Sequence, residues 1–115
     1  MTYFITNKQR LEMGGCTDFL EFFPGKRKEN SSFWNKKSIL INEDVFDEIG
    51  LGSYFDQYLE DFDFYGFTEV SEEQWNKLVK NSNMLSKEVQ CSIQEIDQWA
   101  QIVFEESDVF TIIGI

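Results

Sequence analysis

Residues 62–80, FDFYGFTEVSEEQWNKLVK, contain both kinds of secondary structure that this chain is expected to use. Between 62 and 70 the residues alternate, and one face is formed by Phe62, Phe64, Gly66, Thr68 and Val70. The other face holds Asp63, Tyr65, Phe67 and Glu69, so the pattern predicts a strand with two partly apolar faces. The next four residues, Ser-Glu-Glu-Gln at 71–74, form a capping box. This box predicts a helix to about Lys80 that packs through Trp75, Leu78 and Val79.

The residues after 80 predict a second helix and a closing strand. The polar triplet at 81–83 interrupts the first helix, and Ser86 is placed to cap a long helix that runs to about Glu105. The apolar stripe of this helix comprises Val89, Ile93, Ile96, Trp99 or Ala100, and Val103. Residues 109–115, VFTIIGI, are apolar enough to need burial on both faces, so we expect them to form a central strand.

The residues before 62 predict further strands and a short helix. Strands are expected at 2–6, 17–23 and 38–41, separated by a polar loop over 7–15 and a polar, basic connection over 26–37. Asn42 has the character of an N-cap, and the helix that it opens should end near Ile49, before Gly50. Residues 52–60 fit helical spacing better than alternation.

Together these elements predict one α+β domain over residues 1–115, with a mixed sheet of four to five strands and about three helices packed on one face. A chain of 115 residues, 42% hydrophobic and 17% aromatic, can build such a core without metal or disulfide support. We expect Trp75 and Trp99 in this core. Trp34, in the basic connection, is the tryptophan expected to be most exposed.

The charge composition argues against several classes of function. The chain has 10 basic and 21 acidic residues, and a net charge of −11 opposes direct binding to nucleic acid or to an anionic membrane surface. It has no His, which removes the commonest general base and the usual zinc ligand. The run from Asp61 to Gly66 departs from a calcium loop because Tyr65 stands where a third ligand belongs. We therefore expect no enzyme, no catalytic residue, no cofactor and no metal site.

Cysteine usage and the N-terminal segment point to a reducing compartment. The N-terminus lacks the residue order of a signal peptide, and no run approaches the length of a membrane helix. Cys16 and Cys91 are the only cysteines. We expect a cytoplasmic protein in which both thiols are free, because cytosolic thiols stay reduced.

Acidic residues are concentrated in the middle of the chain. No Lys or Arg occurs from Ser38 to Asn76, whereas eleven acids do, interleaved with aromatic residues. Five of the ten basic residues lie just before this span, at Lys26, Arg27, Lys28, Lys36 and Lys37. The acids either solvate the surface and the helix starts or form a negative surface for a basic partner. Acids at helix starts already have a local role, so the partner-binding candidates are Asp56, Glu60, Asp61, Asp63, Tyr65 and Glu69.

The second half of the chain resembles a known group of proteins in outline. An aromatic strand ends in Gly-Phe-Thr-Glu-Val, a helix begins Ser-Glu-Glu-Gln-Trp-Asn-Lys-Leu, and a long amphipathic helix and a short apolar strand follow. Over residues 62–115 this order resembles the small acidic immunity proteins of bacterial polymorphic-toxin systems, including those of contact-dependent inhibition. These families have no catalytic motif, so no functional residue is carried across. The resemblance implies a cytosolic protein that binds one cognate toxin, often a basic nuclease, and blocks its active site.

Four hypotheses follow, and the leading one is an immunity protein that neutralises a basic, nuclease-like toxin domain. The alternative is a nucleic-acid-mimicking inhibitor of a host or phage-defence nuclease, which would share the acidic surface. A small enzyme and a structural adaptor are the other two. A toxin gene immediately upstream would favour the first hypothesis over the second. The pattern leaves the toxin's activity and the oligomeric state open.

Overall fold

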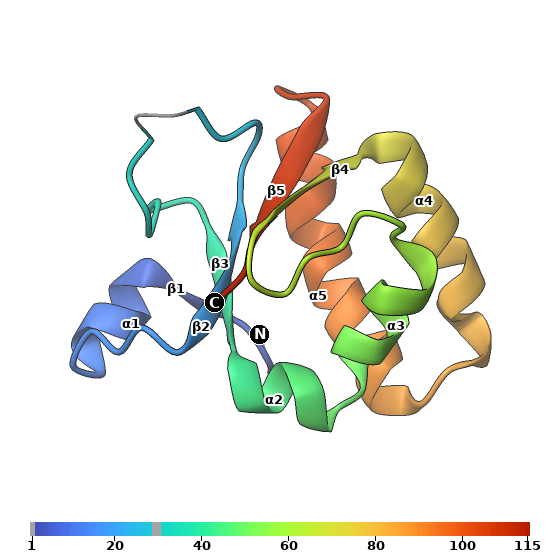
Figure 1. Cartoon of the computed structure of the whole chain (residues 1–115), viewed down its shortest axis with the longest axis horizontal. Helices are drawn as coiled ribbons and strands as arrows, with labels where there is room; N and C mark the ends of the chain where they lie inside the picture. Colours follow the sequence, from blue (N-terminus) through green and yellow to red (C-terminus); the bar gives the residue numbers. More distant parts are fainter. Residues whose placement is uncertain (1, 29–30) are drawn as a thin grey trace.

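The strands of the computed structural model, which describes residues 2–28 and 31–115, form one sheet in the order β1-β3-β2-β5-β4 (Figure 1). Each neighbouring pair of strands is antiparallel. The strands are β1 (Ile5–Thr6), β2 (Phe19–Phe23), β3 (Ile39–Asn42), β4 (Phe67–Ser71) and β5 (Val109–Ile113). As expected, β5 lies inside the sheet, where it pairs with β2 on one side and β4 on the other.

Side-chain caps define where most of the helices begin. Thr6, Asn42, Ser71 and Ser86 each accept hydrogen bonds from backbone N–H groups in the first turn of the helix that follows. The caps predicted at 42, 71 and 86 are thereby confirmed. The helices are α1 (Asn7–Glu12), α2 (Glu43–Glu48), α3 (Leu51–Tyr58), α4 (Glu72–Asn81) and α5 (Lys87–Phe104), with a 3-10 turn η1 (Ser82–Met84).

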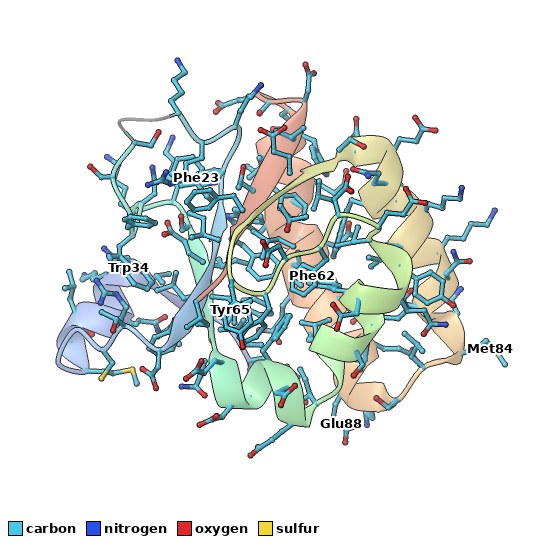
Figure 2. The ribbon with its side chains drawn as sticks, in the orientation of Figure 1. Phe23, Trp34, Phe62, Tyr65, Met84 and Glu88 are labelled. Atoms are coloured by element: carbon cyan, nitrogen blue, oxygen red, sulfur yellow. The ribbon has the colours of Figure 1, made fainter. Side chains whose placement is uncertain are left out.

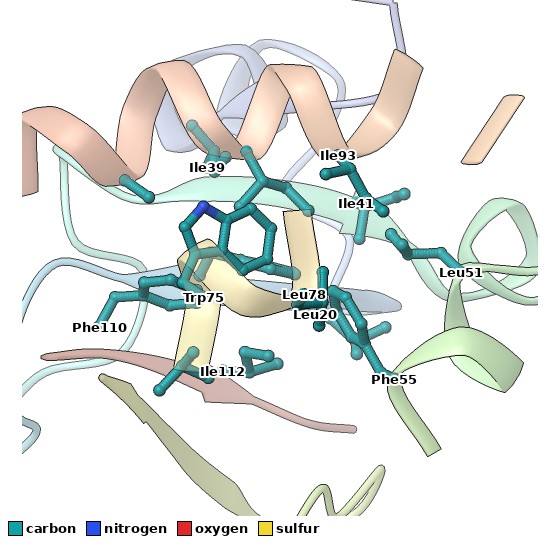
Figure 3. Packing of buried hydrophobic residues seen from close by; sticks show 14 of the residues in the cluster. Leu20, Ile39, Ile41, Leu51, Phe55, Trp75, Leu78, Ile93, Phe110 and Ile112 are labelled. Atoms are coloured by element: carbon teal, nitrogen blue, oxygen red, sulfur yellow. The ribbon is translucent and has the colours of Figure 1, made fainter. Parts of the chain in front are cut away.

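The main hydrophobic core lies between one face of the sheet and helices α2 to α5. Trp75 of α4 is fully buried, its indole Nε1 donates to Asp97 Oδ1 over 2.8 Å, and its ring meets Phe110 edge-on at 5.5 Å. Figure 3 shows this indole at the centre of the cluster, among side chains from the sheet and the helices. The strand residues in the core cluster alternate as period-two packing requires: Leu20, Phe22, Ile39, Ile41, Val70, Phe110 and Ile112.

The opposite face of the sheet is covered by α1 and by residues 24–28 and 31–38 of the connection between β2 and β3 (Figure 1). Apolar residues on this face are also buried, namely Phe19, Phe23, Leu40 and Ile113. Glu21 lies among them with 1% exposure, and its carboxylate accepts hydrogen bonds from Trp34 N, Asn35 N and Ser38 Oγ. Thr111 Oγ1 donates to Gly25 O over 2.8 Å. These bonds fasten the connection to the sheet.

The α+β class is confirmed, but two details of the predicted architecture are wrong. The sheet is antiparallel throughout its described strands rather than mixed, and five α-helices are described rather than about three. A single helix between two strands brings the chain back so that the second strand runs parallel to the first. Here two helices, α4 and α5, join β4 to β5. The chain therefore reverses direction once more, and β5 runs antiparallel to β4.

Two local predictions are also wrong. Residues 7–15 were expected to be a loop, yet Thr6 and Gln9 form a capping box that opens α1, which leaves β1 only two residues long. The strand predicted over 62–70 is confined to Phe67–Ser71. Upstream of it, Asp63 Oδ1 accepts from Tyr65 N, and this turn replaces the alternation.

Of the three tryptophans, only Trp75 is fully buried as predicted. Trp99 is partly buried, and its Nε1 donates to Lys37 O over 2.8 Å while its ring packs against Phe110. Trp34 is also partly buried, because the Arg10 guanidinium lies 4.0 Å from its ring centre.

Candidate functional site

An acidic concavity lies between α2, α3 and the loop from 59 to 66. We call it the acidic groove, and its volume is about 450 Å³. It is lined by four carboxylates and a set of aromatic and small residues: Glu43, Asp44, Asp47, Asp56, Phe46, Gly52, Ser53, Phe62, Phe64 and Tyr65. Asp44, Asp47 and Asp56 are exposed, and Glu43 is half-buried. Their charges therefore face solvent, where they are available to a partner.

Close packing of α2 against α3 brings these carboxylates together. Asn42 fixes the start of α2, because its Oδ1 accepts from Asp44 N at 2.9 Å and from Val45 N at 3.3 Å. The ring of Phe46 then packs directly on Gly52 of α3, where an added Cβ would lie 2.9 Å from Phe46 Cε2. Only glycine allows this approach, so α2 and α3 are held with their acidic faces side by side.

The floor of the acidic groove is a chain of aromatic rings that runs from the core to the surface. Phe46 is buried and lies 5.8 Å from Phe55, 6.0 Å from Phe62 and 6.1 Å from Phe64, measured between ring centres. Phe64 in turn meets Tyr65 edge-on at 5.2 Å. Tyr65 ends this chain and is 79% exposed. Figure 2 shows it near the middle of the molecule, above α2.

The structure brings only two of the six predicted partner-binding residues into this groove, Asp56 and Tyr65. Glu60 lines a different hollow, between α3 and α4, together with Lys77. Asp61 is exposed in the loop after α3. Asp63 is exposed but accepts a hydrogen bond from Tyr65 N, so it has a role in the turn. Glu69 is an exposed residue of β4, opposite Thr111 of β5. As partner contacts, all six stay predictions.

The structure also places in the groove three acids that were not among the predicted partner-binding residues, Glu43, Asp44 and Asp47. Glu43 and Asp44 were assigned to the start of a helix, where Asn42 already accepts from the first backbone N–H groups. The available signal was their spacing. Residues three and four apart lie on one face of a helix, so Asp47 shares a face with both Glu43 and Asp44.

Other carboxylates have structural partners within the protein. Glu95 accepts hydrogen bonds from Tyr3 N and Phe4 N, which holds the N-terminal segment against α5. Asp97 accepts from the indole of Trp75 and from the side-chain amide of Gln101. These acids stabilise the fold, in contrast to the solvent-facing acids of the groove.

One tyrosine of α3 has a strongly perturbed ionisation. Tyr54 is buried and its hydroxyl donates to Leu78 O over 2.7 Å. Burial, with a smaller contribution from Tyr58, raises the pKa of Tyr54 to about 12. The neutral hydroxyl is therefore a structural link between α3 and α4.

Three further observations bear on the class of protein. Among residues 2–28 and 31–115, no cluster of three or more Cys, Asp or Glu side chains has the arrangement of a metal site. The described helices include none with the length and apolar character needed to cross a bilayer. Cys16 and Cys91 are both free, as predicted, with Cys16 exposed and Cys91 partly buried.

Comparisons of the chain with models of protein families, with curated proteins and with solved structures found no match.

Proposed function

We propose that this protein binds a basic protein partner through the acidic groove and neutralises it, as an immunity protein does with its cognate toxin. The supporting observation is the groove itself, in which four carboxylates from two helices surround a floor of aromatic rings. A basic, nuclease-like toxin domain is the partner that suits this charge and the resemblance of residues 62–115 to immunity proteins.

Charge supports a basic partner on physical grounds. Like charges held close together repel one another and lower the stability of the free protein. A cationic surface relieves this repulsion on binding, and the long-range field accelerates the encounter. Exposed aromatic side chains beside the acids provide the apolar contacts that anchor most protein interfaces. The acidic groove has both features, since its lining includes four carboxylates and the exposed ring of Tyr65.

The experiment is a capture from lysate of the source cells followed by a test of growth. The bait is compared with a groove variant, Asp44→Asn, Asp47→Asn and Asp56→Asn, and with a control variant, Glu105→Gln, Glu106→Gln and Asp108→Asn. The control acids are exposed and lie at and beyond the end of α5, and none of them lines the groove. Both variants raise the net charge from −11 by three units to −8, so only the position of the change differs.

The proposal predicts one basic partner, retained by the wild type and the control variant and lost from the groove variant. Expressed alone, this partner should stop growth, and co-expression with the wild type should restore it. A captured phage-defence or host nuclease that is harmless to its own cells would support the nucleic-acid-mimic alternative instead. Equal capture by all three proteins would exclude the groove as the binding surface.

A further inference from the structure

A second hollow, on the sheet face opposite the main core, gathers exposed apolar side chains from three separate segments. Its volume is about 350 Å³. Four large residues on its lining are exposed: Phe33 by 52%, Tyr65 by 79%, Phe67 by 55% and Ile115 by 43%. Single exposed apolar residues are ordinary on a protein surface, but a contiguous group marks an interaction site. We call this group the aromatic hollow.

Contacts within the protein order one wall of the aromatic hollow. The Arg27 guanidinium carbon lies 4.2 Å from the ring centre of Phe33 and 4.7 Å from that of Phe67, so the cation joins the two rings. Trp34 has φ of 63°, which is unusual for a bulky residue, and its N–H donates to Glu21 Oε1 over 2.8 Å. Side chains that are already ordered lose little entropy when a partner binds.

The C-terminal residues fasten the other wall. Gly114 N donates to Gly66 O over 2.8 Å, and Ile115 N donates to Phe64 O over 2.9 Å. An added Cβ on Gly114 would collide with the backbone of Phe64, so this close approach requires glycine. The loop that carries Tyr65 is therefore held against β5.

The chemistry of the lining favours an apolar occupant over a cationic one. Glu21 lines the aromatic hollow, but its two oxygens already accept three hydrogen bonds, from Trp34 N, Asn35 N and Ser38 Oγ. The charge at the base is thus engaged within the protein. What remains for a partner is the surface of the rings and of Ile115.

Tyr65 connects this hollow to the acidic groove, because it lines both. In Figure 2 it lies between Trp34, on the side of α1, and Phe62, on the side of α3. A polypeptide bound over the carboxylates can therefore extend past Tyr65 into the aromatic hollow. Interfaces commonly have this layout, with an aromatic centre beside a charged rim.

We propose that the aromatic hollow receives one bulky apolar side chain from the same basic polypeptide that binds the acidic groove. This inference rests on the proposed function, because we assign the side chain in the aromatic hollow to the positively charged partner of the acidic groove. It adds a second requirement to that function. The partner must present a large apolar residue next to its basic residues.

Two capped synthetic pentapeptides test the proposal, each with four basic residues around a central residue that is tryptophan in one and alanine in the other. Each is titrated into ¹⁵N-labelled protein, and the amide shifts are followed by NMR. The tryptophan peptide should move the amides of Phe67, Ile113 and Ile115 as well as those of Asp47 and Asp56. The alanine peptide should move only the groove amides and bind about tenfold more weakly, the difference expected from burying one large side chain.

Two variants test whether this difference in affinity between the peptides arises at the aromatic hollow. Tyr65→Ala should bring the affinities for the two peptides within about twofold of one another. Met84→Ala, at an apolar residue with 93% exposure outside both concavities, should preserve the tenfold difference. The ¹⁵N spectrum of each variant also reports whether it remains folded.

The outcomes separate the two proposals. If both peptides move the groove amides alone and bind equally, the aromatic hollow is not a binding site, while the proposed function stands. If neither peptide moves the groove amides, the basic-partner function fails, and the inference that rests on it fails as well. A difference that persists in Tyr65→Ala would also overturn the role of the aromatic hollow.

Discussion

Replacing Glu21 by glutamine should weaken the fold and loosen the connection that forms one wall of the aromatic hollow. The carboxylate is 1% exposed and accepts from Trp34 N at 2.8 Å, Asn35 N at 2.9 Å and Ser38 Oγ at 2.6 Å. Glutamine keeps one accepting oxygen and places an NH₂ group where the other oxygen stood. At least one buried donor then loses its acceptor, and the remaining bonds lose their charge.

The magnitude follows from these three bonds. A buried donor without a partner costs about 1–3 kcal/mol, and a hydrogen bond to a charged group exceeds a neutral one by about 1 kcal/mol. We therefore expect Glu21→Gln to lower the free energy of unfolding by about 2–4 kcal/mol, a large part of the stability of a domain this size. Ser38→Ala, which removes one donor, should cost about 1 kcal/mol.

Urea denaturation, followed by tryptophan fluorescence, measures these differences. Glu69→Gln is the control, because this exposed carboxylate should change stability by no more than about 0.5 kcal/mol. Hydrogen exchange adds a local readout. The amides of Trp34 and Asn35 should lose protection in Glu21→Gln and keep it in Glu69→Gln. A Glu21→Gln protein as stable as the control would refute the argument that this carboxylate anchors the connection.

Three further changes test other parts of the fold. Gly52→Ala should destabilise the protein by about 1–3 kcal/mol in urea denaturation, because the new methyl group would crowd the ring of Phe46; an unchanged midpoint would show that α2 can shift freely. Burial raises the pKa of Tyr54 from 10.0 to about 12, so its contribution to stability is full below pH 10 and is lost as the pH rises through 12. The midpoint of thermal unfolding of the wild type should therefore fall at alkaline pH, and Tyr54→Phe should make this fall smaller. An identical fall in both proteins would contradict the role of Tyr54. Without denaturant or reductant, Cys16 should react with a thiol reagent at once and Cys91 more slowly, since Cys16 is exposed and Cys91 is partly buried; equal rates would place Cys91 at the surface.

The parts of the fold that the sequence predicted correctly are those with a local cause. Capping residues at 42, 71 and 86 locate three helices, and the apolar run from Val109 locates an interior strand. The helix α1 also has a local cause, the capping box of Thr6 and Gln9, whereas the polar composition of the segment predicted a loop. Here a specific hydrogen-bonding pattern was the stronger guide.

The prediction of a strand over 62–70 was wrong for a reason that the alternation of apolar and polar residues does not reveal. Phe62 and Phe64 pack against Phe46, a partner on α2, while Asp63 makes a turn with the N–H of Tyr65. These contacts depend on the approach of α2 to α3 through Gly52. The sequence pattern therefore predicted the apolar character of this segment correctly and its backbone incorrectly.

The acidic groove was only partly predictable for a similar reason. Charge density along the chain predicted a negative surface, and two of the six predicted partner-binding residues, Asp56 and Tyr65, line the acidic groove. Grouping Asp56 with Asp44 and Asp47 needs the relative placement of two helices, which no local pattern gives. The aromatic hollow combines residues 33, 65 to 67 and 115, so it too exists only in the folded chain.

The association rate of the captured partner, measured by stopped-flow at several salt concentrations, tests most directly whether the acidic groove attracts a basic protein. We expect the groove variant, Asp44→Asn, Asp47→Asn and Asp56→Asn, to associate about tenfold more slowly than the wild type at low salt and to depend less steeply on salt. The control variant at Glu105, Glu106 and Asp108 should follow the wild type, although its net charge equals that of the groove variant. Identical rates and salt slopes for the groove variant and the wild type would show that these carboxylates only solvate the surface, and the claim would be contradicted.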